Sequence, residues 1–376
     1  MEEKIAVALS EKDSESAVKE ISLKTKIVFP KATKLFFVFF TPHYKPSTIL
    51  KTVNFTLKPH FLLGIQASFL IFENRIIEKG VIGVCLNKEE MELKEIFIKG
   101  DDSQNIESTL RTLSKNFLGE KGFLLSFLSH RLIPYFFLRG MEISLGKAFK
   151  ALGGGFIKKY SWANWQIVRN NICEGMLNIL GKGIKIDFLK INGFTPLGRP
   201  FRITKVISKT GIIMEIENQP AINIYKKYLE EKFDTFIKNR LFSFYPLGII
   251  ERNEVKMLDV IDYLDDGSLV CIGNLKENTF AHIMCLQPSV LFDNLRNKLK
   301  NLKGNRGLIF IINSLMRKRN LKEHAEEEIK LIKEHFKENF NLVGIYTDYS
   351  IFPYTETREI GIEGSNLLLT LWNLEG

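Results

Sequence analysis

Clustered cysteines and histidines are missing from this sequence of 376 residues. The four cysteines stand far apart and form no CxxC pair: Cys85, Cys173, Cys271 and Cys285. A disulfide framework or a cysteine-rich zinc site needs clustered cysteines, so the sequence supports neither. His324 and His335 share one face of a predicted helix, but their spacing places them roughly 16 Å apart, too far to bind one ion. We therefore expect no metal site.

Long apolar runs are also missing. The apolar run Ile5–Leu9 near the N-terminus is shorter than the about 7–15 residues of a signal peptide. The stretch over 123–138 is interrupted by His130, Arg131 and Pro134, whereas a membrane span needs about 20 apolar residues. We expect a cytoplasmic protein with no membrane among its partners.

Motifs of the common enzyme classes do not occur. The sequence contains no GxSxG nucleophile motif, and no Walker lysine follows the triple glycine Gly153–Gly155. We predict that this triple glycine forms a tight turn, and that Gly181-Lys182-Gly183 forms a hairpin turn, because glycine adopts turn conformations at no steric cost. Without a triad, a metal set or a cofactor loop, the chain is not expected to be an enzyme or to carry a cofactor.

What the chain has is an ordinary globular composition with a basic balance. Hydrophobic residues make up 45% and charged residues 26%, and the formal net charge is +10. The strongest basic cluster lies between Asn294 and Lys322 and contains no acid. A predicted strand divides this cluster, and its only aromatic residue, Phe310, lies in that strand. Because single-stranded nucleic acid is bound through exposed aromatic side chains as well as cations, nucleic acid is not expected as a partner.

Apolar patterning in the first half predicts an α/β opening. The unalternating run from Lys34 to Phe40 is typical of a strand buried on both faces, and a helix is predicted from Thr48 to Leu57. His43 follows this run directly, where sites are common in α/β folds, although an ordinary loop histidine is the default. Further along we predict a helix over 101–118. The stretch over 122–137 is either an apolar strand or a buried helix, which its pattern does not distinguish. Antiparallel hairpin strands are predicted over 166–168, 174–180, 184–191 and 203–207.

After Pro220 the apolar period changes from two to about 3.6, which predicts an amphipathic helix over 221–237. The same period predicts helices over 290–302 and 321–340, between strands over 255–264, 269–272, 308–312, 342–346 and 366–372. The predicted fold class is α/β with α+β character, in which two consecutive mixed-sheet modules carry flanking helices. The predicted domains are a mostly polar segment over 1–24 and modules over 25–217 and 218–376.

Short motifs follow one another along the chain in a specific order. The second half contains Gly193-Phe-Thr-Pro-Leu-Gly198, Ile203-Thr204-Lys205, the stretch from Glu215 to Tyr225, Ile312-Asn313-Ser314-Leu315-Met316-Arg317-Lys318 and Gly344-Ile-Tyr-Thr347. The first half contains Phe39-Phe40-Thr41-Pro42-His43, Leu63-Gly64 and Gly80-Val81-Ile82-Gly83. Over residues 25–372 this order resembles the FIST-domain family, with an N-terminal and a C-terminal FIST module.

The resemblance implies a cytoplasmic sensory module that binds a small ligand, such as an amino acid or another carboxylate, and is not an enzyme. It also implies a separate histidine kinase or other signalling protein as partner, because the chain contains no output motif of its own. A ligand site is expected between the two modules. Some members of the family bind haem, so a haem-based gas sensor is one alternative function.

The resemblance also suggests four ligand-binding residues. Arg317 would clamp a carboxylate, since its guanidinium presents paired donors, and Asn313, Thr347 and Asn366 would supply hydrogen bonds. The alternative is that Asn313 and Asn366 only cap strand ends.

The sequence departs from the family pattern in three places. Ser314 replaces a cysteine, Tyr349-Ser350 replaces a Gly-Glu pair, and Leu368 stands where a hydroxyl residue often follows the asparagine. These replacements are consistent with a second alternative, a protein-interaction module whose ancestral ligand pocket has degenerated.

Overall fold

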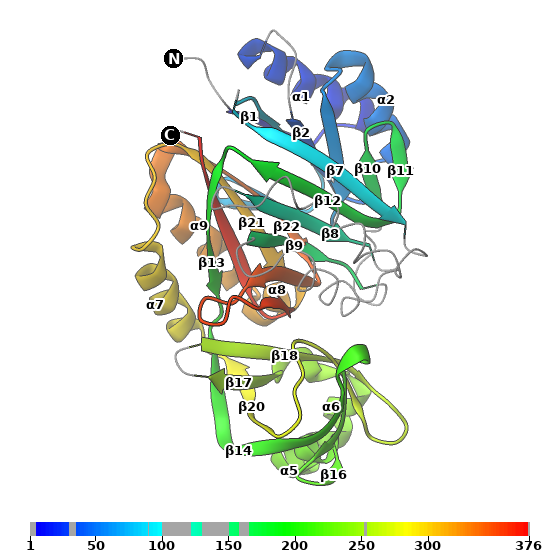
Figure 1. The fold of residues 1–376 in the computed structure, drawn as a ribbon, viewed down its shortest axis with the longest axis vertical. Coiled ribbons are helices and arrows are strands. Elements are labelled where there is room, and N and C mark those ends of the chain that lie inside the picture. Colours follow the sequence, from blue (N-terminus) through cyan, green and yellow to red (C-terminus); the bar gives the residue numbers. More distant parts are fainter. Residues whose placement is uncertain are drawn as a thin grey trace.

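The computed structural model describes residues 5–29, 35–88, 90–99, 122–129, 150–157, 165–251 and 254–374. Four sheets organise these residues, three of six strands and one of seven (Figure 1). The predicted α/β class is confirmed. The helix predicted over 101–118 and the end of the stretch predicted over 122–137 lie outside the described residues. None of the described helices is long and apolar enough to cross a membrane.

Sheet A forms one outer layer with two helices on its face. Its strands, in spatial order, are β1 (Ile5–Ser10), β6 (Val81–Leu86), β2 (Leu35–Phe40), β3 (Phe61–Gln66), β10 (Gln166–Val168) and β11 (Asn171–Cys173). Helices α1 (Ser14–Val28) and α2 (Pro46–Thr56) pack on it, and Asp13 caps α1. Every residue of β2 is buried, as its unalternating sequence predicts, because alternate side chains face the helices and the other sheets.

Sheets B and C each combine strands from both halves of the chain. Sheet B contains β13 (Lys185–Ile191), β25 (Leu367–Asn373), β21 (Gly307–Ser314), β22 (Phe340–Thr347), β4 (Leu70–Phe72) and β5 (Arg75–Ile77). Sheet C contains β24 (Ile360–Glu363), β23 (Tyr349–Pro353), β9 (Lys150–Gly155), β8 (Phe123–Leu128), β12 (Gly175–Lys182) and β7 (Glu92–Lys99). Helices α7 (Pro288–Leu299), α8 (Leu315–Leu321) and α9 (His324–Phe336) lie against sheet B.

One hydrophobic core joins sheets A, B and C. The ring of Phe39 in sheet A stacks on Phe310 in sheet B, with centroids 5.2 Å apart. Phe310 also contacts Phe127 of sheet C edge-on at 6.3 Å, and Phe37 contacts Trp372 at 6.3 Å. Aromatic side chains thus fill the space where three sheets meet, which is where much of the phenylalanine in the sequence is used.

Sheet D forms a separate lobe, at the bottom of Figure 1. Its strands are β14 (Phe194–Ile207), β20 (Thr279–Leu286), β17 (Leu247–Glu251), β18 (Glu254–Tyr263), β19 (Leu269–Ile272), β15 (Ile212–Ile216) and β16 (Gln219–Pro220). Helices α5 (Asn223–Leu229) and α6 (Phe233–Lys238) share its core. The two ends of this segment meet, since Gln287 N donates to Gly193 O at 3.0 Å. The boundary predicted between 217 and 218 falls between two strands of this one sheet.

The hairpins predicted in the middle of the chain are wrong for β12, β13 and β14, because these consecutive strands belong to sheets C, B and D. The first and the last of the predicted strands do form antiparallel hairpins, β10 with β11 and β14 with β15. Gly181 lies inside β12 rather than in a turn, and only Gly183, with φ of +91°, has the backbone conformation of one. Because β12 is buried along nearly its whole length, it needs neighbours on both faces, which a solvated hairpin cannot supply.

The triple glycine is also a strand and not the predicted turn. It forms the end of β9, which pairs in parallel with β8 and antiparallel with β23. A Cβ on Gly155 would overlap the phenol ring of Tyr349, and a Cβ on Gly154 would lie 2.8 Å from Tyr349 O. Glycine is therefore needed here for the close approach of neighbouring groups.

Two predicted helices are shorter or broken. The helix expected over 221–237 is interrupted between α5 and α6, where Glu230 has φ of +44°. The helix expected over 321–340 runs only over α9, because Lys322 and Lys337 at its two ends have positive φ. Apolar spacing continues across each break, so the pattern alone could not show it.

Candidate functional site

Sheet B brings three of the predicted site residues to one end. Asn313 and Ser314 end β21, Thr347 ends β22 and Asn366 directly precedes β25. In the register of the sheet, Ser314 lies opposite Thr347 and Asn313 lies opposite Leu367. Asn313, Thr347 and Asn366 are each at most 1% exposed.

Arg317, the fourth predicted residue, lies on helix α8 and is completely buried. Ser314 caps this helix by accepting hydrogen bonds from Met316 N at 3.1 Å and Arg317 N at 3.4 Å. The guanidinium forms an ion pair with Glu328 of α9: Nε donates to Oε1 at 3.1 Å, and Nη2 also donates to Oε1. Asn313 Nδ2 donates to Glu328 Oε2 at 3.2 Å. Within the described part of the chain, Arg317 Nη1 is buried without a hydrogen-bond partner.

Asn366 belongs to a second buried network, which ties sheet D to the rest of the molecule. It accepts a hydrogen bond from the Ser350 hydroxyl and donates to Glu363 Oε2 at 3.1 Å. The other oxygen of Glu363 accepts from Lys190 Nζ at 3.0 Å, Tyr354 OH at 2.8 Å and, in sheet D, Met257 N at 3.1 Å. The Thr347 hydroxyl donates instead to Tyr349 O at 2.9 Å.

Two buried carboxyl groups lie beside these networks. Asp259 of β18 accepts hydrogen bonds from Gly364 N at 2.5 Å and from the Ser365 hydroxyl, and burial raises its pKa to about 7. Burial likewise raises the pKa of Asp348 to about 7, although its Oδ2 accepts from Ile157 N at 2.5 Å. Desolvation disfavours the charged carboxylate and outweighs the hydrogen bonds at both positions.

A cavity of about 540 Å³ opens next to helix α8. It is lined by Pro42, His43, Ser68, Phe69, Glu78, Leu315, Lys318 and Arg319. The cavity lies just past the ends of β2 and β21, the carboxyl ends at which open α/β sheets commonly bind ligands. Its lining comes from both sides of the predicted module boundary.

The lining of this α8 cavity combines two cations with one carboxylate. Lys318 Nζ lies 4.1 Å from the centroid of the Phe69 ring, and Arg319 is exposed beside it. Glu78 supplies the only acidic side chain of the lining. Ser68 Oγ is buried and, among the described residues, has no hydrogen-bond partner. The two cations can bind an anionic ligand.

The lining of the α8 cavity is connected to the buried hydrogen-bonded residues around Arg317 and Glu328. Phe69 packs edge-on against Tyr346 with centroids 6.0 Å apart, and Tyr346 OH accepts a hydrogen bond from Asn313 Nδ2 at 3.4 Å. None of the four residues predicted from the resemblance lines the cavity. Sequence reasoning did not place Lys318 and Arg319 at a cavity, although the basic run that follows β21 is visible in the sequence. Glu328 was missed as the partner of Arg317, and its place on the apolar face of α9 was the available signal.

Metal ligands do not gather at this site. Within the described ranges, no group of three or more His, Cys, Asp or Glu side chains could hold a metal ion. His43, the one histidine of the α8 cavity, has its Nδ1 3.2 Å from Thr41 Oγ1.

Comparison with known families decides the identity. Residues 34–219 match the FIST N domain and residues 221–349 match the FIST C domain. The chain belongs to the FIST family. FIST domains are sensory domains linked to signal transduction. The limit between the two FIST domains lies at β16, inside sheet D, so the family's sequence modules are not separate sheets in space.

More distant comparisons add little. None of the curated proteins compared with the chain matches it. A crystal structure of chorismatase covers 98% of both chains, at 6% sequence identity and a TM-score of 0.33. A likeness this weak supports no conclusion about fold or activity.

Proposed function

We propose that this FIST protein is a non-enzymatic sensor that binds a small amino acid or related carboxylate in the α8 cavity. Binding then acts on a separate signalling partner, such as a histidine kinase. The observation that carries the proposal is a cavity built by both FIST modules and lined by Lys318 and Arg319. The four residues suggested by the resemblance do not line this cavity, so the proposal gives them no direct contact with its ligand, and the buried pair of Arg317 and Glu328 supports the cavity from behind.

The charges of the lining favour an amino acid. Lys318 and Arg319 complement a carboxylate, and Arg319 can present two donors to it in parallel. Glu78 complements the ammonium group that an α-amino acid carries and a simple carboxylate lacks. The volume of about 540 Å³ falls within the range of small-molecule pockets.

Transmission to a partner follows from the position of α8. This short helix carries Lys318 and Arg319 towards the ligand and Arg317 towards Glu328 of α9. A ligand that draws Lys318 and Arg319 inward therefore acts on α8 and, through one buried ion pair, on α9. A ligand shifts such an equilibrium only by its differential affinity for the two positions of the helix.

Thermal-shift measurements with the full chain test the proposal. Pools of the amino acids and of di- and tricarboxylates are added, and a ligand at about 100 times its Kd is expected to add about 2.7 kcal/mol of stability. The stabilisation should be lost in Lys318→Glu and Arg319→Glu and kept in Lys300→Glu, which makes the same charge change on an exposed residue away from the cavity. Glu78→Gln should weaken the binding of amino acids and leave the binding of simple carboxylates unchanged.

Two outcomes would overturn the proposal. Stabilisation by no pool would favour the alternative of a protein-interaction module with a degenerate pocket. Stabilisation that persists in both charge-reversed variants would place the ligand elsewhere.

The haem alternative is tested separately. Three of the eight residues that line the α8 cavity carry a charge, Glu78, Lys318 and Arg319, which favours a small polar ligand over haem. A Soret band after addition of haem, lost in His43→Ala, would revive that alternative.

A further inference from the structure

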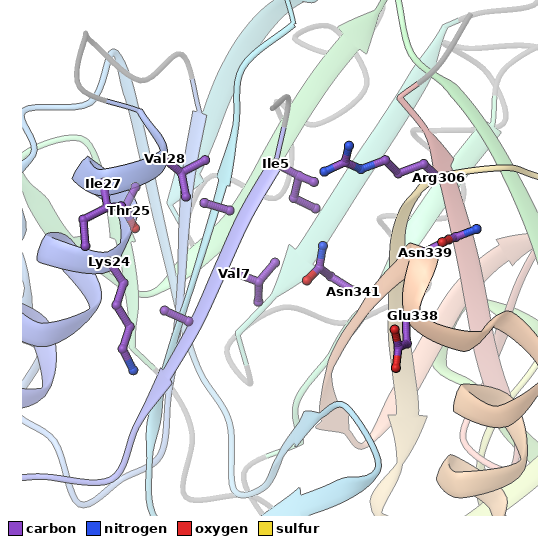
Figure 2. Close-up of a pocket in the computed structure, with 12 residues that line it drawn as sticks. Ile5, Val7, Lys24, Thr25, Ile27, Val28, Arg306, Glu338, Asn339 and Asn341 are labelled. Atoms are coloured by element: carbon purple, nitrogen blue, oxygen red, sulfur yellow. The ribbon is translucent and has the colours of Figure 1, made fainter. Parts of the chain in front are cut away.

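A second and larger cavity, of about 750 Å³, follows the outer side of strand β1 (Figure 2). Its floor is formed by the consecutive residues 5–8 of β1. One wall is the last part of helix α1, with Lys24, Thr25, Ile27 and Val28. The other wall is formed by Arg306, Glu338, Asn339 and Asn341, at the beginnings of β21 and β22. We call this cavity the β1 groove.

Among the described residues, strand β1 is an edge strand of sheet A. In the described part of the chain it pairs only with β6, in antiparallel register from Ile5↔Leu86 to Ser10↔Val81. The outer edge of such a strand presents main-chain N–H and C=O groups that a further strand can pair with. Edge strands are usually protected by charges, proline or a bulge, but Ile5–Ser10 contains neither a charged residue nor proline, and its register is continuous.

Helix α1 extends past β1 on the same side. Ile27 is 82% exposed and lines the groove, and Leu23, one helical turn earlier, is 65% exposed. Their exposure contrasts with the buried face of α1, where Ala17, Val18 and Ile21 pack on β1 and β6. One more strand beside β1 would continue both the sheet and its contact with α1.

The opposite wall suits a polypeptide main chain. Asn339 and Asn341 are amides, which can both donate to and accept from a peptide backbone. Figure 2 shows Asn341 opposite Val7, with Arg306 extending towards the end of β1 that carries Ile5. Lys24 and Arg306 stand on the two walls, and Glu338 is the one acid of the lining. Lys24 also pairs with Glu20 of its own helix at 2.9 Å, and the chain as a whole carries a net charge of +10. The charges therefore favour acidic rather than basic side chains in the occupant.

We propose that the β1 groove binds an extended, acidic segment of a partner polypeptide as an additional strand of sheet A. Main-chain hydrogen bonds to β1 provide affinity, apolar side chains of the segment cover Ile27 and Val28, and its carboxylates face Lys24 and Arg306. The groove is lined by none of the residues of the α8 cavity, so this inference does not rest on the proposed ligand.

The test uses a library of random peptides as long as β1, which has six residues, selected against the immobilised full chain. Selected peptides should alternate apolar and polar residues and contain Asp or Glu. Their affinity, measured by fluorescence anisotropy, should fall about tenfold in Ile27→Asp, which is about 1.4 kcal/mol. The matched control is Phe55→Asp on α2, because Phe55 is also 82% exposed but does not line the groove. Peptide binding should slow hydrogen exchange at the amides of β1.

Four results would overturn the inference. No selected peptide, equal loss of affinity in both variants, or unchanged exchange at β1 would show that the groove is not a strand-binding site. Dimerisation of the chain alone that protects β1 and is abolished by Ile27→Asp would identify the occupant as a second copy instead of a partner. A thermal shift by amino acids that survives in Ile27→Asp would show that the α8 cavity is intact in that variant, so the two proposals can fail separately.

Discussion

Removal of Arg317 should destabilise the protein far more than the loss of an ordinary ion pair. In Arg317→Met, Glu328 remains fully buried, and its carboxylate keeps only the hydrogen bond from Asn313 Nδ2 at 3.2 Å among the contacts described here. Leaving one member of a buried pair without its partner costs about 3–5 kcal/mol. Because the carboxylate retains so little compensation, we expect a loss in the upper part of this range.

The double variant Arg317→Met/Glu328→Leu should recover most of this loss, since apolar residues of similar volume often replace a buried pair at little cost. The control is Lys330→Met on the same helix, where Lys330 and Glu326 form an exposed pair at 4.0 Å. Such a pair is worth about 0.3–0.5 kcal/mol.

The free energy of unfolding is measured by urea titration with circular dichroism for five proteins: the unsubstituted chain, Arg317→Met, Glu328→Leu, the double variant and Lys330→Met. A loss below about 1 kcal/mol in Arg317→Met, or a double variant as unstable as the sum of the single variants, would refute the reasoning. The first result would mean that the guanidinium is available to a ligand at little structural cost. The second would mean that the two charges do not compensate one another.

Three further predictions concern other buried positions. Burial raises the pKa of Asp259 from 3.8 to about 7, so the folded protein binds more protons than the unfolded chain between these values and loses stability as the pH rises through them. Urea titrations at about pH 5 and about pH 8 should show that Asp259→Asn removes part of this fall, up to about 2.7 kcal/mol over the two pH units below the folded pKa, and an identical fall in both proteins would contradict the assigned cause. Gly155→Ala should lower stability by about 1–3 kcal/mol, because the new methyl group overlaps the buried Tyr349 ring, and an unchanged unfolding midpoint would show that β9 has room to move. Ser314→Ala should cost about 0.5–2 kcal/mol, since the cap of α8 is lost together with the hydrogen bond to Gly364 O; a change below about 0.3 kcal/mol would show that water replaces the hydroxyl.

Local structure was largely predictable from the sequence, because apolar spacing follows directly from the surfaces an element buries. The run of Leu35–Phe40 is a strand with helices on one face and sheets on the other, and α9 follows its apolar period. Breaks at single residues, such as Glu230, escaped prediction because a positive φ at a non-glycine residue leaves no mark in the apolar pattern.

Strand pairing could not be predicted in the same way. Strand β4 pairs with β22, whose partner residues lie about 270 positions later in the chain, and β13 pairs with β25 near the C-terminus. A strand's own residues show that it is buried, but not which distant strand supplies its hydrogen bonds. The triple glycine illustrates this, since its need for glycine comes from Tyr349.

The resemblance pointed to the neighbourhood of the α8 cavity but not to the residues that line it. The resemblance pointed to the end of β21 and to the residues that follow it, and the α8 cavity does adjoin that point. The distinction between Arg317, which is buried against Glu328, and Lys318 and Arg319, which line the cavity, depends on the rotation of one short helix. That rotation is set by contacts with α9 and sheet B, which the sequence of α8 does not contain.

The meeting of Gly193 and Gln287 has a consequence for how this protein can be divided. A fragment that ended at the limit of the FIST N domain would keep β14 to β16 and lose the four strands that complete their sheet. The lobe of sheet D is better defined as residues 194–286, because the chain enters and leaves it at neighbouring positions, Gly193 and Gln287. A short loop joining 193 to 287 would therefore remove the whole lobe at one point of the chain. The same deletion would break the buried hydrogen bonds from Gly364 N to Asp259 and from Met257 N to Glu363, so the remaining molecule would have to bury or solvate Glu363 anew.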